Sequence, residues 1–369
     1  MSPLSPELPF ATPADLAECR ALLRGGSRSF HAAAVMLPQR VRDAATSLYA
    51  FCRLADDVVD LEADPRAGLQ RLRERLAGAY AGYPHDFAAD RAFADVIDRY
   101  AIPRALPEAL LEGFEWDAEH RRYPDLGALT AYATRVAGTV GAMMAMLMNA
   151  RAEAVVARAC DLGIAMQFTN IARDVGEDAR YGRLYLPLEW LVEAGIDPQA
   201  WLARPVHSPA LAGVVQRLLA AADEFYARAD GGIACLPVGC RPGMQAARRL
   251  YAEIGREVER RGLDSVSARA RVARLRKARV LATAFRAALV STPLSLEGPH
   301  PAARFLVDAV ASTARRQAEL ERGQANGWNV RARSRWLLDL FERLERRERM
   351  ALGFSPQAVG ARALNGRDH

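Results

Sequence analysis

Hydrophobic residues recur three and four positions apart along most of the chain, which is the spacing of one face of an α-helix. Gly and Pro residues interrupt this pattern at intervals and mark the ends of the predicted elements. No stretch alternates between apolar and polar residues for long enough to indicate a sheet. We therefore expect an all-α fold. The predicted helices cover residues 13–24, 39–61, 66–80, 88–100, 104–119, 126–149, 151–175, 187–194, 209–229, 241–261 and 268–290.

The same pattern divides the chain into three parts. Residues 1–290 contain the predicted helices and should form one main domain. Residues 291–302 contain Pro, Ser and Gly and are predicted to be a linker. Residues 303–369 return to helical patterning with many charges, so we expect a basic helical extension that either lies on an anionic bilayer or packs on the main domain. Several of its apolar residues share one helical face: Trp336, Leu337, Leu340, Phe341 and Leu344.

Composition supports a helical protein and reveals an uneven charge. The chain has 369 residues, of which 51% are hydrophobic, and this is enough for one large core or two modest ones. The formal net charge is +6, and residues 241–369 carry 26 Lys and Arg against 13 Asp and Glu. Such a basic segment suits anionic lipid or diphosphate groups, or is simply a solvated surface. Interleaved glutamates weaken a face for tracking nucleic acid, so no nucleic-acid partner is expected.

Targeting and cysteine signals favour a cytoplasmic protein. The N-terminus lacks the basic-then-apolar pattern of a signal peptide. The longest uncharged apolar stretch, residues 136–150, is too short to cross a bilayer as a helix. The five cysteines are scattered without a C-x-x-C pair, which is typical of reduced structural thiols. We expect a cytoplasmic location, with peripheral contact at the inner face of the membrane as the alternative left open.

Two acidic segments far apart in the sequence resemble each other. Asp56 and Asp60 lie four positions apart in the sequence, and so do Asp174 and Asp178. This spacing places each pair on one face of a helix. Like charges one turn apart destabilise a helix by about 0.2–0.5 kcal/mol per pair, and here the surrounding residues are apolar. Carboxylates that emerge from a buried helix need a positive partner.

Magnesium bound to a diphosphate is the partner that fits these carboxylates best. Mg²⁺ takes oxygen ligands and binds through a few carboxylates together with substrate phosphates. The alternative without a metal is that both segments are solvent-exposed acidic helix faces, whose carboxylates pair with nearby arginines. The repetition of the motif, each time with an arginine just before it (Arg53 and Arg173), favours the metal site.

Other chemistries lack their motifs in this sequence. The chain has neither a P-loop nor a dinucleotide fingerprint, and it contains no H-E-x-x-H and no G-x-S-x-G. Its six histidines show no ligand spacing. General acid–base catalysis by histidine is therefore not indicated. That suits a reaction driven by departure of a diphosphate, in which metal and arginine supply the electrostatic stabilisation.

The motifs resemble those of the squalene and phytoene synthase family over about residues 18–290. This resemblance implies a single all-α bundle of the isoprenoid synthase type around a central active-site cavity, with residues 1–290 as the catalytic domain. The motifs that carry it are Gly26–Ser27–Arg28–Ser29–Phe30, Tyr49 and Arg53 leading into Asp56–Asp60, Tyr132 with residues 136–141, and residues 167–178 followed by residues 180–187.

The resemblance also implies roles for individual residues. The metal ligands would be Asp56, Asp60, Asn170, Asp174 and Asp178. The catalytic set would add Arg53 and Tyr185 to the four aspartates, Tyr185 lying near the departing diphosphate. The substrate-binding residues would be Ser27, Arg28, Ser29, Phe30, Tyr49, Arg53, Gln167, Asn170, Arg173 and Tyr251. Apolar side chains that could line the tunnel for the substrate tails are Phe30, Phe51, Met143, Met144, Met146, Leu147 and Phe168.

The activity implied is a magnesium-dependent prenyltransferase reaction, with Mn²⁺ as a second option for the metal. Two prenyl diphosphates join head to head through a cyclopropyl diphosphate. Residues 235–254 look most similar to the bacterial members that convert two geranylgeranyl diphosphates to phytoene, the first step of carotenoid biosynthesis, for which no NADPH is expected. The alternative is squalene, dehydrosqualene or hydroxysqualene formed from two farnesyl diphosphates. A remote alternative is a non-catalytic helical scaffold that docks on membranes or on carotenoid enzymes.

Overall fold

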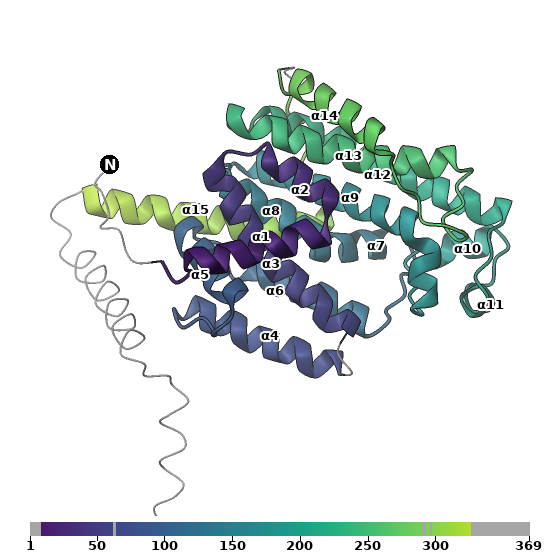
Figure 1. Ribbon diagram of the computed structural model, residues 1–369, viewed down its shortest axis with the longest axis horizontal. Helices are drawn as coiled ribbons and strands as arrows, with labels where there is room; N and C mark the ends of the chain where they lie inside the picture. Colours follow the sequence, from purple (N-terminus) through teal and green to yellow (C-terminus); the bar gives the residue numbers. More distant parts are fainter. Residues whose placement is uncertain (1–8, 62–63, 290–292, 296, 326–369) are drawn as a thin grey trace, which may run out of the picture.

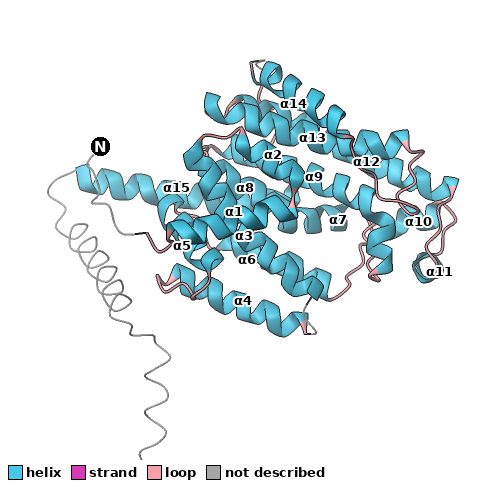
Figure 2. Ribbon diagram, viewed as in Figure 1, coloured by secondary structure: helices cyan, strands magenta, loops and turns pink. Residues whose placement is uncertain are grey.

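The computed structural model describes residues 9–61, 64–289, 293–295 and 297–325, without the side chains of residues 28, 59–61 and 320–325. Every regular element in these ranges is helical, and none is a strand (Figure 2). The all-α prediction is therefore confirmed. Within the same ranges, no helix combines the length and the hydrophobicity that crossing a bilayer requires.

The helices follow one another through short loops. The first half of the chain forms α1 (Pro13–Gly26), α2 (Arg28–Val35), α3 (Gln39–Leu61), α4 (Pro65–Tyr80), α5 (Ala88–Tyr100), α6 (Ala105–Ala118), α7 (Leu126–Ala133), η1 (Thr134–Gly138) and α8 (Thr139–Leu147). The second half forms α9 (Glu153–Arg180), α10 (Leu188–Glu193), α11 (Pro198–Ala203), α12 (Pro209–Ala234), η2 (Val238–Cys240), α13 (Arg241–Arg260), α14 (Arg274–Ala288), η3 (Pro301–Ala303) and α15 (Arg304–Ala325).

Several boundaries differ from the sequence prediction for local reasons. Ser27 accepts a hydrogen bond from the amide of Phe30, so a new helix, α2, begins where the prediction had none. The helix predicted at 268–290 begins only at Arg274. Just before the predicted start, Asp264 accepts hydrogen bonds from the amides of Val266 and Ser267 in a turn, and beyond it Arg269 binds Asp174 of α9. The predicted helix 126–149 is interrupted by the π-helical turn η1.

The long helix α9 runs through the middle of the bundle (Figure 1) and packs against α8, α12 and α13. Its contact with η1 is unusually close. A Cβ atom at Gly163 would lie 2.2 Å from the carbonyl oxygen of Ala137, so only glycine fits at this crossing. The glycine therefore brings α9, with its acidic segment, tightly against the α7–η1–α8 stretch.

The predicted linker and the start of α15 both contact the bundle. Arg158, whose side chain is fully buried, donates hydrogen bonds to the carbonyl oxygens of Glu297 and Gly298. Leu306 and Val307 at the start of α15 belong to the main hydrophobic core. The division into main domain, linker and extension stays a prediction, since residues 326–369, including the predicted apolar face at Trp336, lie outside the described residues.

Candidate active site

A cleft of about 1170 Å³ opens among α3, α6, α9, α13 and the loop before α14. We call it the polar cleft. Both acidic helices reach it: Asp56 comes from α3, and Asp174 and Asp178 come from α9. The cleft brings together most of the residues predicted from the sequence, namely Ser27, Ser29, Tyr49, Arg53, Asp56, Gln167, Asn170, Arg173, Asp174, Asp178, Tyr185 and Tyr251. The side chains of Arg28 and Asp60 lie outside the described part of the structure.

Arginines neutralise the carboxylates of the cleft. The guanidinium of Arg53 lies 2.8 Å from Asp56. Asp174 is held from two sides, since Arg173 donates a 2.7 Å hydrogen bond to it and Arg269 approaches to 2.8 Å from the loop before α14. Among the described residues, no three His, Cys, Asp or Glu side chains gather closely enough to form a ready-made metal site. The carboxylates instead reach the cleft from two different helices, and Asp56 and Asp174 are each paired with arginine.

The donor set nevertheless fits a hard divalent cation. The polar cleft offers carboxylate and amide oxygens from Asp56, Asn170, Asp174 and Asp178, the ligand type that Mg²⁺ prefers. Burial, followed by the charge of Asp174, raises the pKa of Asp178 to about 8. A bound cation would favour the charged form of such a buried carboxylate, because it offsets both the loss of water and the charge of the neighbouring carboxylate.

A fourth aspartate of the cleft was not predicted from the sequence. Asp117 on α6 is buried and accepts hydrogen bonds from the hydroxyls of Tyr185 (2.7 Å) and Tyr132 (2.9 Å). Burial raises the pKa of Asp117 to about 7. The rings of Tyr132 and Tyr185 are stacked with centroids 5.1 Å apart. Tyr185 therefore faces the cleft with its hydroxyl already fixed.

Basic residues close the cleft on the side of α14. Their positions were not predicted, although the sequence carried a signal: residues 265–296 contain seven Lys and Arg and no Asp or Glu. The lining residues concerned are Arg269, Arg271, Arg274 and Lys277. This wall gives the cleft the positive charge that a diphosphate requires.

The motif around Ser27 packs against α3. A Cβ atom at Gly26 would lie 2.1 Å from the hydroxyl oxygen of Tyr49, so glycine is needed for this approach. The ring of Phe30 stacks on Tyr49 with centroids 5.5 Å apart. Ser27 and Ser29 thereby line the polar cleft, while Phe30 turns into the neighbouring pocket.

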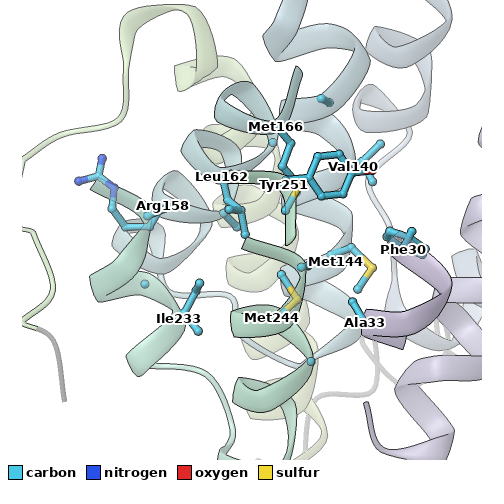
Figure 3. Close-up of a pocket in the computed structure, with 18 of the residues that line it drawn as sticks. Phe30, Ala33, Val140, Met144, Arg158, Leu162, Met166, Ile233, Met244 and Tyr251 are labelled. Atoms are coloured by element: carbon cyan, nitrogen blue, oxygen red, sulfur yellow. The ribbon is translucent and has the colours of Figure 1, made fainter. Parts of the chain in front are cut away.

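That neighbouring pocket, which we call the apolar pocket, has a volume of about 180 Å³ (Figure 3). Phe30, Met144, Leu162 and Met166 surround it from three different helices. Four residues line both the apolar pocket and the polar cleft, so the two are contiguous: Val136, Gln167, Asn170 and Tyr251.

The expected tunnel lining is only partly correct. Phe30 and Met144 line the apolar pocket as expected. Phe51 instead stacks on Phe93, and Phe168 packs edge-on against Phe225, both in the hydrophobic core. Met143, Met146 and Leu147 are likewise core residues and do not line the pocket. Helical spacing placed all of them on buried faces but could not tell the core from the pocket.

An all-α bundle that joins a charged cleft to an apolar pocket is the architecture of an isoprenoid synthase. Residues 23–279 match the model of the squalene/phytoene synthase family. The chain belongs to this family, which makes it an enzyme of the prenyltransferase type.

Individual relatives agree with this assignment. The phytoene synthase of Rhodobacter capsulatus is 51% identical over 306 residues, covering 81% of this chain and 90% of that protein. The phytoene synthase of Cereibacter sphaeroides is 47% identical over 368 residues, covering 95% and 98%. Among solved structures, a dehydrosqualene synthase in complex with a ligand superposes with a TM-score of 0.67 at 29% identity, covering 74% of this chain and 96% of that one.

Proposed function

We propose that the protein joins two molecules of geranylgeranyl diphosphate head to head to form phytoene, the first step of carotenoid biosynthesis. The observation that carries this proposal is the junction of the polar cleft with the apolar pocket at Gln167 and Asn170. A prenyl diphosphate has the same division into an anionic head and an apolar tail. The relatives named phytoene synthase support geranylgeranyl diphosphate as the substrate and phytoene as the product.

The chain's own residues would bind and orient the two diphosphates. Arg53, Arg173 and Arg269 already bind carboxylates of the cleft, and each can donate to phosphate oxygens instead. The residues that would hold Mg²⁺, or Mn²⁺ in its place, are Asp56, Asp60, Asn170, Asp174 and Asp178. When bound, the metal supplies positive charge to the departing diphosphate.

The reaction then proceeds by two ionisations. The C–O bond of one substrate breaks, and its diphosphate leaves with the electron pair. The double bond of the second substrate attacks the allylic cation, and loss of a proton closes a cyclopropyl diphosphate. Breakage of the second C–O bond, rearrangement and loss of a second proton give the central triene, so no NADPH is expected. The apolar pocket keeps water from the cations, and Tyr185, fixed by Asp117, faces the departing diphosphate.

Product identification with defined substrates tests the proposal. Purified full-length protein with Mg²⁺ and without NADPH is given geranylgeranyl diphosphate or farnesyl diphosphate, and both diphosphate release and the hydrocarbon are measured. We expect phytoene from the first substrate, loss of product with a chelator, and recovery with Mg²⁺ or Mn²⁺. A squalene-type product from farnesyl diphosphate alone would overturn the choice of substrate. Unchanged product with Asp56→Ala and Asp174→Ala would overturn the metal site and favour the scaffold alternative.

We also propose a cytoplasmic enzyme that works in contact with the inner face of the membrane. A long hydrocarbon product is insoluble in water, and the next carotenoid enzymes would receive it most directly from a bilayer. The contact proposed from the sequence was the extension at residues 303–369. The described part of the chain offers a second surface for this contact.

A further inference from the structure

The outward face of α14 exposes an unusual amount of apolar surface. Ten large hydrophobic side chains are exposed among the described residues, and three of them belong to this one helix and its C-cap: Leu275 (67% exposed), Phe285 (58%) and Leu289 (85%). Figure 1 shows α14 along the outer edge of the bundle, beyond α13. A cluster of this kind on a surface helix marks an interaction site rather than chance exposure.

The exposed residues form a continuous line. Alternate steps of three and four residues connect the apolar positions, which places them on one face of the helix. We call this line the apolar stripe, and it consists of Leu275, Ala278, Ala282, Phe285 and Leu289, all of them exposed. The opposite face is the one used for folding, because Leu281 and Ala284 pack against Ala246 and Ala247 of α13.

The segment that carries the stripe has charges of one sign only. Residues 265–296 contain no Asp or Glu. Arg279 and Arg286 are exposed and lie beside the stripe at helical spacing, about 60–80° around the axis from its centre. An apolar face bordered by arginines is the pattern of a helix that lies in the plane of a membrane interface.

We propose that the apolar stripe of α14 docks on the surface of a bilayer that contains anionic lipid. A second copy of the chain fits less well, since two such faces would bring their arginines together without carboxylates to pair with them. Nucleic acid would use the arginines but would leave Leu275, Phe285 and Leu289 without an apolar partner. Anionic lipid satisfies both features at once, because its headgroups bind arginine and its acyl chains bury the apolar side chains.

The position of α14 would bring the docked membrane close to the apolar pocket. Leu281 packs, on the inner side of the helix, in the same small cluster as Met166, which lines the apolar pocket. The inner side of α14 and the wall of the apolar pocket therefore meet the same small cluster, which includes Ala246 and Ala247 of α13. Only the reason for docking rests on the proposed function, namely delivery of an insoluble hydrocarbon to the bilayer. The docking itself is measured without substrate.

Vesicle flotation of the full-length protein tests the proposal. The vesicles contain phosphatidylcholine alone or phosphatidylcholine with phosphatidylglycerol, and binding is measured over a range of salt. We expect binding to the anionic vesicles only, weakened by roughly fivefold for each of Arg279→Glu and Arg286→Glu. The double variant Phe285→Ser/Leu289→Ser should lose binding by roughly tenfold or more. None of these residues lines the polar cleft or the apolar pocket.

A matched control lies on the loop before α12. Arg204 is exposed and Val206 is 52% exposed, so Arg204→Glu/Val206→Ser changes the same kinds of side chain elsewhere and should bind vesicles normally. Equal binding by wild type and all three α14 variants would overturn the proposal, as would a dimer in sedimentation that only the α14 variants abolish. Binding of duplex DNA through Arg279 and Arg286, without binding to vesicles, would also overturn the proposal. Circular dichroism confirms folding, and product formation from detergent-dispersed substrate tests the proposed function separately.

Discussion

The hydroxyl of Tyr185 donates a 2.7 Å hydrogen bond to one oxygen of Asp117, while the other oxygen accepts a 2.9 Å hydrogen bond from Tyr132. One buried carboxylate thus joins α6, α7 and the loop after α9 on the wall of the polar cleft. Asp117 does not reach its partners through sequence spacing, since Tyr185 is 68 residues away. We interpret Asp117 as a positioning residue that fixes the two hydroxyls facing the substrate.

Replacing Asp117 by residues of similar size should show how much its hydrogen bonds to the two tyrosines contribute to stability. In Asp117→Leu both tyrosine hydroxyls lose their acceptor, which costs about 1–3 kcal/mol for each buried group. Asp117→Asn keeps one acceptor oxygen and should lose less stability. Urea unfolding measures the free energy, and product formation is followed in parallel. A Leu variant as stable and as active as wild type would show that the hydroxyls are satisfied without Asp117.

The same carboxylate should make stability depend on pH. Burial raises the pKa of Asp117 from 3.8 to about 7, so between these values the folded protein keeps a proton that the unfolded chain has released. Its contribution to stability is therefore complete below about pH 4 and is lost as the pH rises through about 7. Over that window we expect stability to fall by about 1.4 kcal/mol per pH unit from this group.

Asp117→Asn provides the control for this pH effect, because an amide does not titrate in this range. The difference in unfolding free energy between wild type and variant, measured in urea with chelator present, should shrink as the pH is raised from about 5 to about 7. Parallel curves for the two proteins would contradict the assignment to Asp117.

A residue of this site could be predicted from the sequence when its partners lie close to it in the sequence. Asp56 and Asp174 were found because their partners lie one turn away, and helical geometry alone puts each pair on one face. The structure then brings both helices to one cleft, as expected. Asp117 has no such neighbour in the sequence, so it looks like any surface aspartate until the helices are packed.

The helical fold was predictable because the spacing of apolar residues is also a short-range pattern. The interruptions at η1 and at the loop before α14 were not predictable in this way. The π-helical turn η1 keeps the apolar spacing of a regular helix, so nothing in the pattern marks it. The loop before α14 looked helical because Arg and Ala favour helices, yet Asp264 holds its start in a turn. This loop carries Arg269 to the cleft, and the error therefore hid a residue that contacts Asp174.

Arg269 should matter for catalysis more than for folding. Its guanidinium is 41% exposed and lies 2.8 Å from Asp174 and 3.1 Å from Glu177. Because Asp174 keeps its hydrogen bond to Arg173 and the guanidinium of Arg269 is partly exposed, Arg269→Gln should cost under about 1 kcal/mol of stability. Loss of a charged donor to diphosphate should lower kcat/KM by roughly ten- to a hundredfold.

The matched control for Arg269 is Arg217→Gln. Arg217 lies 2.6 Å from Glu193 in a pair whose two side chains are both exposed, and neither residue lines the polar cleft. We expect a similarly small loss of stability and normal kcat/KM. If steady-state kinetics showed the same change for both variants, the role of Arg269 at the diphosphate would be wrong.

The crossing of α9 and η1 yields a pair of glycine substitutions with opposite expected signs. In Gly163→Ala the new Cβ would lie 2.2 Å from the carbonyl oxygen of Ala137, so α9 must move away, which costs about 1–3 kcal/mol or more. Asn170 and Asp174 lie two to three turns further along α9, and their displacement should also reduce product formation. Gly213→Ala, on an exposed part of α12 with nothing within 4 Å, should stabilise by about 0.5–1 kcal/mol. Thermal unfolding that shifted in the same direction for both variants would contradict the close approach of the two helices.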